Sequence, residues 1–172
     1  MTDFKLKIVL CGSYDSGKTS LITQFIKSRF TKEYKLTVGV DILTKDVDLG
    51  NGLSCTLSIW DIGGQERFNF IRSTFYRGTS GALLVFDISR PSTWDALKMW
   101  HAELNQFAAN VPFIVIGNKM ELLKDVGEVI DRKQCRKYAE EKGGVYIETS
   151  SKYNIAVEEA FIKIARMIVE KL

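Results

Sequence analysis

The sequence lacks the features that mark membrane-spanning, secreted or nucleic-acid-binding proteins. No apolar stretch in its 172 residues approaches the ~20 that cross a bilayer, and no secretory signal peptide is visible. There is no long run of basic residues, and a net charge of +3 is too small to indicate a nucleic-acid partner. The three cysteines are an odd number at irregular spacing, so reduced thiols in a cytosolic protein fit better than a disulfide framework.

Signals for lipid anchors are also missing from the chain as it stands. Residue 2 is Thr, whereas myristoylation needs Gly, and the last residues, Glu170-Lys171-Leu172, include no prenylation cysteine. We therefore expect a cytoplasmic protein that reaches a membrane only if a lipidated tail is missing from this chain. Linkers, internal repeats and low-complexity segments are absent, so residues 1–172 are predicted to form a single domain.

What the sequence does contain is an alternation of strand-like and helix-like segments. Strands are predicted at residues 4–10, 38–49, 53–60, 81–87, 111–117 and 145–147, and helices at 20–28, 92–109, 131–142 and 154–171. Gly50-Asn51-Gly52 is a strong hairpin signal, and Ser92 and Asp131 are suitable N-caps. The alternation predicts an α/β fold with a six-stranded, mostly parallel sheet, helices on both faces and one antiparallel edge strand.

Residues 12–19, G-S-Y-D-S-G-K-T, match the phosphate-binding pattern G-x-x-x-x-G-K-[ST] at every fixed position. A predicted strand precedes the motif and a predicted helix follows it, which is the context that the pattern needs. Backbone N–H groups of such a loop form a nest for phosphate oxygens at the helix N-terminus. Lys18 would reach the β- and γ-phosphates, and the Thr19 hydroxyl would bind Mg²⁺. The residues expected to line this nucleotide site are Gly12, Ser13, Tyr14, Asp15, Ser16, Gly17, Lys18, Thr19 and Ser20.

Other predicted strand ends supply groups suited to a metal ion and a water molecule. Asp61 directly follows a strand and can hold Mg²⁺ through water, and Thr37 in the long loop is a second candidate hydroxyl ligand. Gly64 lets the backbone approach a γ-phosphate, and Gln65 can orient the attacking water. The metal ligands predicted from the sequence are therefore Thr19, Thr37 and Asp61.

Two further strand ends are suited to recognising a base. Asn118-Lys119-Met120-Glu121 brings a carboxylate that can accept from the N1–H and 2-amino group of guanine, whereas adenine presents an acceptor at N1. After the last strand, residues 148–152 read E-T-S-S-K, and backbone N–H groups of Ser150, Ser151 and Lys152 can meet the guanine carbonyl.

These segments together resemble the small GTPases of the Ras superfamily, and the Rab branch most closely, over essentially the whole chain. The Rab-like pieces are T-V-G-V-D at 37–41, W-D-I-G-G-Q-E-R-F at 60–68, F-Y-R-G at 75–78, and E-T-S-S-K. The resemblance implies a P-loop NTPase fold, GTP and GDP as ligands, slow GTP hydrolysis, and two switch segments at about 30–41 and 61–76. It implies that Gln65, Lys18 and Thr37 carry the chemistry, that Phe30 stacks edge-on against guanine, and that Tyr34 closes over the phosphates.

The resemblance also implies an exchange factor, a GTPase-activating protein and effectors that bind the switch surface. Residues expected on that surface are Ile42, Trp60, Phe75 and Tyr76, with Ile42 in the place of the usual Phe. The surface either recognises different partners or these side chains close the core.

Tyr14, Asp15 and Glu121 depart from the family pattern. Tyr14 stands where relatives have Gly or Ser, and a phenol there would compete with Gln65 and with an incoming arginine, so we expect slow and poorly stimulated hydrolysis unless Tyr14 turns to solvent. Asp15 is expected to point outward. Glu121 replaces Asp, so guanine preference is expected to be kept with weaker affinity, unless the backbone absorbs the extra methylene.

The sequence leaves three hypotheses for the function, and it also contains residues that we expect to have a structural role only. The first is a GTP/GDP switch, the second a hydrolysis-impaired, nucleotide-locked scaffold or adaptor, and the third a P-loop kinase or ATPase, against which the N-K-M-E and E-T-S-S-K segments argue. His101 is expected to be an ordinary surface or boundary residue, and Trp94 and Trp100 to be packing residues.

Overall fold

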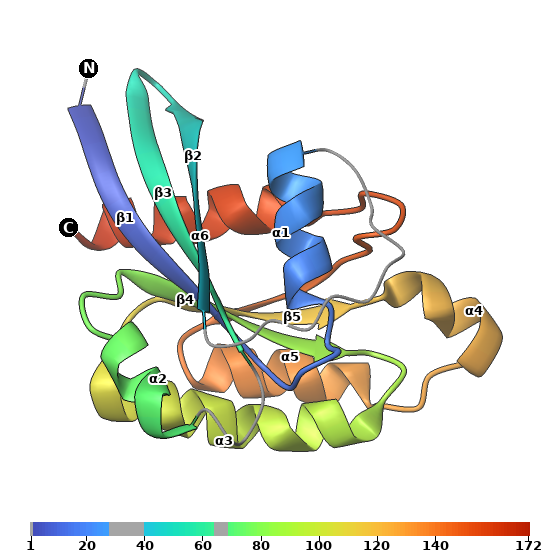
Figure 1. The fold of residues 1–172 in the computed structure, drawn as a ribbon. Coiled ribbons are helices and arrows are strands. Elements are labelled where there is room, and N and C mark those ends of the chain that lie inside the picture. Colours follow the sequence, from blue (N-terminus) through green and yellow to red (C-terminus); the bar gives the residue numbers. More distant parts are fainter. Residues whose placement is uncertain (1, 28–39, 64–68) are drawn as a thin grey trace.

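The structure, a computed structural model, describes residues 2–27, 40–63 and 69–172 as one sheet flanked by helices (Figure 1). Five of the residues that the sequence assigns to the site, Phe30, Tyr34, Thr37, Gly64 and Gln65, lie outside the described residues. Most of the first proposed switch segment and residues 64–68 of the second also lie outside the described residues.

Six strands form a single sheet in the order β2-β3-β1-β4-β5-β6. Their bounds are β1 Thr2–Cys11, β2 Val40–Gly50, β3 Leu53–Ile62, β4 Gly81–Asp87, β5 Phe113–Asn118 and β6 Val145–Glu148. Among the six strands of this sheet, β2 and β3 pair antiparallel, whereas β1 pairs in parallel with β3 and β4, and β5 in parallel with β4 and β6. The predicted α/β fold with one antiparallel edge strand is confirmed, including the hairpin turn between β2 and β3.

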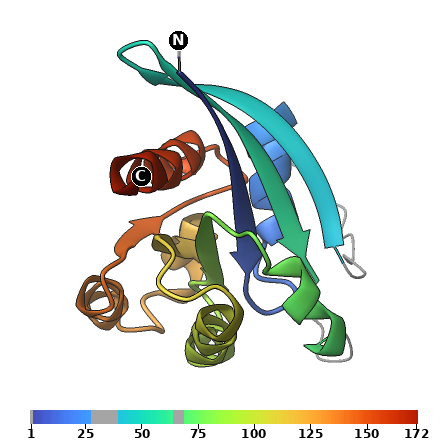
Figure 2. The same cartoon turned by 90° about the vertical axis from the view of Figure 1, so that its left-hand side faces the viewer.

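Helices cover both faces of this sheet. Their bounds are α1 Lys18–Lys27, α2 Asn69–Phe75, α3 Pro91–Phe107, η2 Met120–Leu122, α4 Leu123–Val126, α5 Arg132–Glu141 and α6 Val157–Lys171. Figure 2 shows α1 and α6 on one side of the sheet and α3 and α5 on the other. Among the described residues, no helix is long and apolar enough to cross a bilayer.

The starts of α3 and α5 test the two predicted N-caps. Asp131 caps α5, since its carboxylate accepts from the backbone N–H of Lys133 at 3.0 Å and of Gln134 at 3.3 Å. The Ser92 prediction is wrong, because α3 begins one residue earlier at Pro91, and its N-cap, Arg90, makes no side-chain capping bond. Proline fits the first helical position because its φ is preset and its missing N–H would have no partner there.

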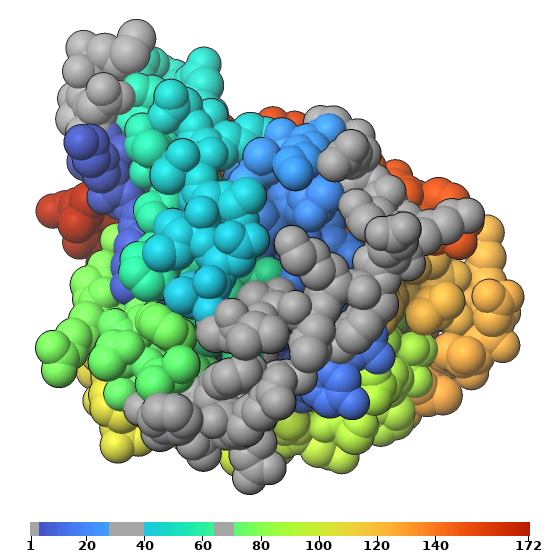
Figure 3. Space-filling model, in the orientation of Figure 1, coloured from blue at the N-terminus to red at the C-terminus, as the bar shows by residue number. Residues whose placement is uncertain are grey.

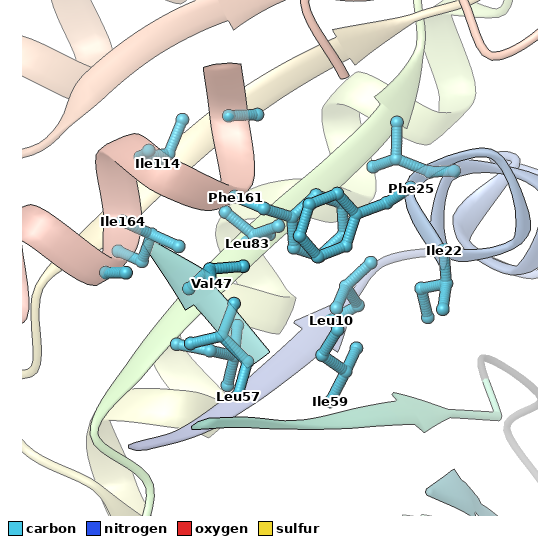
Figure 4. Packing of buried hydrophobic residues seen from close by; sticks show 14 of the residues in the cluster. Leu10, Ile22, Phe25, Val47, Leu57, Ile59, Leu83, Ile114, Phe161 and Ile164 are labelled. Atoms are coloured by element: carbon cyan, nitrogen blue, oxygen red, sulfur yellow. The ribbon is translucent and has the colours of Figure 1, made fainter. Parts of the chain in front are cut away.

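The helix α6 supplies much of one of the two cores. Its buried stripe includes Val157, Phe161, Ile164 and Ile168, whose spacing of three or four residues places them on one face of a helix. Phe161 stacks on Phe25 of α1, with ring centroids 4.1 Å apart and planes within 4° of parallel (Figure 4). This stacking holds α1 against α6 over the central strands. It therefore fixes the position of α1, the helix that follows the phosphate loop.

The second core lies under α3 and α5, and it contains the two tryptophans and the histidine of α3. Trp94 and Trp100 are buried there, which confirms their packing role. The prediction for His101 is wrong, since only 5% of this residue is exposed. Its ring lies 4.3 Å from that of Phe113, and Nδ1 is 2.8 Å from the Tyr138 hydroxyl. A histidine on the sheet-facing side of an amphipathic helix is buried with its apolar neighbours. All three cysteines are also buried and free.

Candidate nucleotide-binding site

The backbone of the loop between β1 and α1 follows a path that requires glycine at two positions. Gly12 has a φ of +148°, and a Cβ there would lie 2.1 Å from the carbonyl oxygen of Val85. At Gly17, with a φ of +93°, a Cβ would lie 2.3 Å from Nδ2 of Asn118. Both glycines of the motif are therefore required by close packing against the next strands, and the loop is shaped as a cradle at the carboxyl end of β1.

Lys18, the first residue of α1, lies within this cradle and is only 5% exposed. Its Nζ donates to the loop's own carbonyl oxygens, at 2.8 Å to Gly12 and 3.0 Å to Ser13. In the part of the chain that the structure describes, no carboxylate lies within 4.0 Å of that nitrogen. Burial lowers the pKa of Lys18, while the more distant charge of Asp61 raises it. A desolvated ammonium held only by neutral oxygens fits a phosphate ligand, whose charge would compensate it.

The predicted metal ligands Thr19 and Asp61 are in direct contact. The Thr19 hydroxyl donates to Oδ2 of Asp61 at 2.5 Å, and Asp61 is only 1% exposed. The parallel β1–β3 register pairs Leu10 with Asp61 and so brings the end of β3 beside the phosphate loop. Hydroxyl and carboxylate oxygens are the ligands that Mg²⁺ prefers when a substrate phosphate completes its shell. The two described residues therefore fit the predicted metal ion.

Asn118, at the end of β5, bonds to two loops through its side chain and is fully buried. Its Nδ2 donates to the carbonyl of Ser16 at 3.2 Å, and its Oδ1 accepts from the hydroxyls of Thr149 at 2.9 Å and Ser151 at 3.3 Å. Its amide group thus holds the phosphate loop and the loop after β6 in a fixed relation. The sequence indicated this residue through its motif but gave no sign that Thr149 would take part.

Lys119 follows in a left-handed conformation, with a φ of +65°. Its Nζ donates to the backbone carbonyl of Asp15 at 2.9 Å and forms an ion pair with Oδ2 of Asp87 at 3.1 Å. Asp87 ends β4 and is 1% exposed. The aliphatic stem of Lys119 passes close to Gly17, so this side chain also forms part of the wall between the phosphate loop and the base loop.

Glu121 carries an acceptor that the described residues do not satisfy. Its Oε1 atom is buried and has no hydrogen-bond partner among them. A buried carboxylate oxygen is costly unless a donor meets it, so the position suits a ligand with N–H groups. This agrees with the predicted recognition of the guanine N1–H and 2-amino group.

The loop after β6 offers fewer free donors than the sequence indicated. The backbone N–H of Ser150 donates to the carbonyl of Ile155 at 3.1 Å, and its hydroxyl accepts from the N–H of Tyr153 at 3.1 Å. Ser150 is therefore occupied in closing the turn, which leaves the backbone N–H groups of Ser151 and Lys152 to meet a base. Ser151 is buried, and Lys152 is exposed.

Tyr14 and Asp15, the two unusual residues of the phosphate loop, both point toward solvent. Tyr14 is 52% exposed. Asp15 directs its carboxylate to Arg90, whose Nη1 lies 2.5 Å from Oδ2. The outward orientation expected for Asp15 is thus present, but nothing in the sequence distinguished Arg90 from an ordinary surface arginine.

Three of the four residues expected on the partner-binding surface are accessible. Ile42 is 48% exposed and lies opposite Trp60 in the β2–β3 register, and the Trp60 ring is 6.3 Å from that of Phe75. Figure 3 shows β2 in cyan and the segment around α2 in green bordering one another on this face. Of the two alternatives for these residues, Tyr76 takes the second and closes the core, because it is fully buried and its hydroxyl donates to Oε2 of Glu103 at 2.5 Å, so it does not belong to the partner-binding surface. Adjacent residues at the end of a helix point in different directions, so Phe75 stays partly exposed at the edge of the core while Tyr76 is buried within it.

Comparison with known proteins agrees with this geometry. Residues 7–170 match the model of the Ras family. The chain is 41% identical over 167 residues to the GTP-binding protein yptV5 of Volvox carteri, covering 94% of this chain and 80% of that protein. It is likewise 41% identical to the Ras-related protein Rab7 of Pisum sativum (94% and 81% covered), and 40% identical to the Ypt/Rab-type GTPase ypt7 of Pyricularia oryzae (94% and 80%). With a phosphate loop, a base loop and a sheet order that all fit, the chain belongs to the Ras family of small GTPases, within its Rab branch.

Proposed function

We propose that this GTPase is a switch that binds GTP or GDP together with Mg²⁺, hydrolyses GTP slowly, and presents different surfaces to partners in its two states. The observation that carries the proposal is the buried Lys18 ammonium, which donates to two carbonyl oxygens of the glycine cradle and lies next to the Thr19–Asp61 contact. Residues 1–172 would act as one G domain.

Each group at the site has a role in binding. Lys18 holds the β- and γ-phosphates, and the loop N–H groups from Ser13 to Ser20 surround them. Asn118 keeps the phosphate and base loops in register, and Glu121 accepts from the guanine edge. Phe30 and Tyr34 complete the site from the first switch segment.

Hydrolysis would depend on residues of both switch segments. Thr19, Thr37 and Asp61, the last through water, would hold Mg²⁺, which would supply positive charge to offset the charge on the phosphate oxygens. Gln65 orients the attacking water, with Gly64 allowing the backbone to approach the γ-phosphate. The switch segments would relax once the γ-phosphate is gone, and the surface that contains the exposed Ile42 and the partly exposed Trp60 and Phe75 would then bind effectors differently.

The nucleotide carried by the freshly purified protein tests the proposal. The protein is denatured and the released nucleotide is identified by chromatography. Mostly GDP is expected, because a working switch turns over the GTP that it binds. Mostly GTP would instead favour a hydrolysis-impaired, nucleotide-locked scaffold, and a protein that neither carries nor binds guanine nucleotide would refute both functions.

Tyr14 is the feature that keeps the locked scaffold as a second candidate. A phenol at this position competes for space with Gln65 and with any arginine that an activating protein inserts, and such an arginine contributes about 10³–10⁵ in rate. Replacing Tyr14 with Gly is expected to raise the single-turnover rate of GTP hydrolysis. An unchanged or lower rate would show that the outward-turned ring, 52% exposed, is harmless.

The base preference rests on Glu121, which replaces the usual Asp. Competition between GDP, ADP and XDP for the site is expected to rank GDP first. The longer side chain rearranges the paired hydrogen bonds, so Glu121→Asp should tighten GDP binding by about 1–3 kcal/mol, the worth of one charge-assisted bond. Equal binding of GDP and ADP would contradict guanine recognition.

Regulators and location are proposed on the basis of the relatives. An exchange factor, an activating protein and effectors would bind the switch surface. A cytoplasmic protein is expected, with membrane association in a form that carries a lipidated tail.

A further inference from the structure

Asp15 places a negative charge in a loop that is built to bind anions. Its backbone is left-handed, with a φ of +67°, a conformation that glycine adopts most easily and that Asp tolerates better than most residues. The motif fixes no side chain at this position. A carboxylate here would repel a nucleotide phosphate unless something holds it away and neutralises it.

Two cations from different strand ends meet that carboxylate. Arg90, which follows β4, places Nη1 2.5 Å from Oδ2, and Lys119, which follows β5, places Nζ 3.8 Å from Oδ1. Lys119 also donates to the backbone carbonyl of Asp15 at 2.9 Å. The shorter of the two ion pairs is that of Arg90, so Arg90 determines where the Asp15 carboxylate points.

The backbone at Arg90 is itself well anchored. Its N–H donates to the carbonyl of Asp87 at 3.0 Å, and its carbonyl accepts from the N–H of Thr93 at 3.0 Å and from the Thr93 hydroxyl at 2.7 Å. Arg90 is also the N-cap of α3. The guanidinium therefore extends from a fixed point at the edge of the phosphate loop.

We propose that Arg90 is a positioning residue for the nucleotide: it holds the Asp15 carboxylate away from the phosphates and so slows nucleotide release. The inference rests on the nucleotide binding described under the proposed function. It assigns to Arg90 an effect that is exerted through Asp15, because without that carboxylate the arginine has no anion to hold at this place.

The test compares the release of a fluorescent GDP derivative from four proteins: wild type, Arg90→Gln, Asp15→Asn and the double variant. Arg90→Gln is expected to release GDP faster by up to about fivefold, the upper limit for an ion pair of which each side chain is about two-fifths exposed. In the Asp15→Asn background the same substitution is expected to leave the rate unchanged. Arg90→Lys, which keeps the charge, should lie near wild type, and added salt should shrink the difference because the pair is open to solvent.

The matched control is Lys137→Gln, which removes an exposed ion pair with Glu141 on α5, where Nζ lies 3.8 Å from the carboxylate. It should release GDP at the wild-type rate. A melting curve of each variant with bound GDP checks that the fold is intact.

The possible outcomes distinguish a failure of the proposed role of Arg90 from a failure of the proposed nucleotide binding. Equal acceleration by Arg90→Gln in the wild-type and Asp15→Asn backgrounds would overturn the proposal, because Arg90 would then act directly through its own charge. So would an unchanged rate in Arg90→Gln while wild type binds the probe normally. Failure of the wild type to bind the probe at all would refute the nucleotide site itself, and the inference with it.

Discussion

Glu103 of α3 is predicted to be the residue whose loss most weakens the attachment of α2. Its carboxylate accepts hydrogen bonds from Arg72 of α2, at 2.9 Å from Nη2 to Oε1, at 3.0 Å from Nε to Oε2 and at 3.3 Å from Nε to Oε1. It also accepts the 2.5 Å bond from the Tyr76 hydroxyl described above. The Arg72 guanidinium lies 4.5 Å above the ring of Trp100, and the Arg72 side chain is 8% exposed against 21% for that of Glu103.

Replacing Glu103 with Ala leaves this nearly buried cation and the buried phenol without their shared acceptor. Breaking a fully buried pair costs about 3–5 kcal/mol, and the partial exposure of Glu103 reduces the expected loss to about 2–4 kcal/mol. The free energy of unfolding is measured by urea denaturation at a fixed excess of GDP and Mg²⁺. The melting temperature should fall by about 2–4 °C for each kcal/mol.

Two comparisons make the reasoning refutable. Glu141→Ala, in the exposed pair with Lys137, should cost no more than about 0.5 kcal/mol. Tyr76→Phe should cost about 1–2 kcal/mol in the wild-type background and much less once Glu103 is gone. If Glu103→Ala proves no more damaging than Glu141→Ala, or if the two effects simply add, the three side chains do not act as one unit.

Three further predictions concern burial, backbone and capping. Burial lowers the pKa of His101, so the unfolded chain takes up the proton first and the free energy of unfolding should fall as the pH drops from 7 to 5; His101→Phe should flatten this slope in urea titrations. Gly17→Ala should weaken GDP binding, measured by calorimetry, at least about tenfold, because the added Cβ would displace Asn118. Gly127 also has a positive φ but open space around it, so the control variant Gly127→Ala should bind GDP as wild type does. Asp131→Ala should cost about 1 kcal/mol of stability by chemical denaturation, and Asp131→Asn much less.

The nucleotide site was predictable where local sequence determines local geometry. Gly12 and Gly17 need backbone angles and close approaches that their motif encodes. The continuous apolar run of β4 was placed at Gly81–Asp87 without error, since a strand covered on both faces leaves no other pattern. The antiparallel edge followed from the hairpin turn at residues 50–52.

The features that could not be predicted depend on the direction in which particular side chains point and on the residues that they contact in the fold. The sequence does not distinguish the neighbouring aromatic residues Phe75 and Tyr76, and their positions at the end of α2 decide that Phe75 stays partly exposed while Tyr76 is buried. The helix α2 itself, Asn69–Phe75, is too short for a periodic signal. Arg90 acquires its contact with Asp15 only because β1 and β4 are neighbours in the sheet, a relation between residues 75 positions apart.

The central position of Asn118 has a thermodynamic consequence. Its amide group joins loops from both halves of the sheet, so a nucleotide that occupies the site also holds those halves together. Ligand that binds only the folded chain adds RT ln(1 + [L]/Kd) to its stability, about 4 kcal/mol at a thousandfold excess over Kd. That amount is comparable to a large part of the net stability of an ordinary domain. For this protein, the concentration of guanine nucleotide in its surroundings would therefore help to set how long the folded chain survives, in addition to which partners it meets.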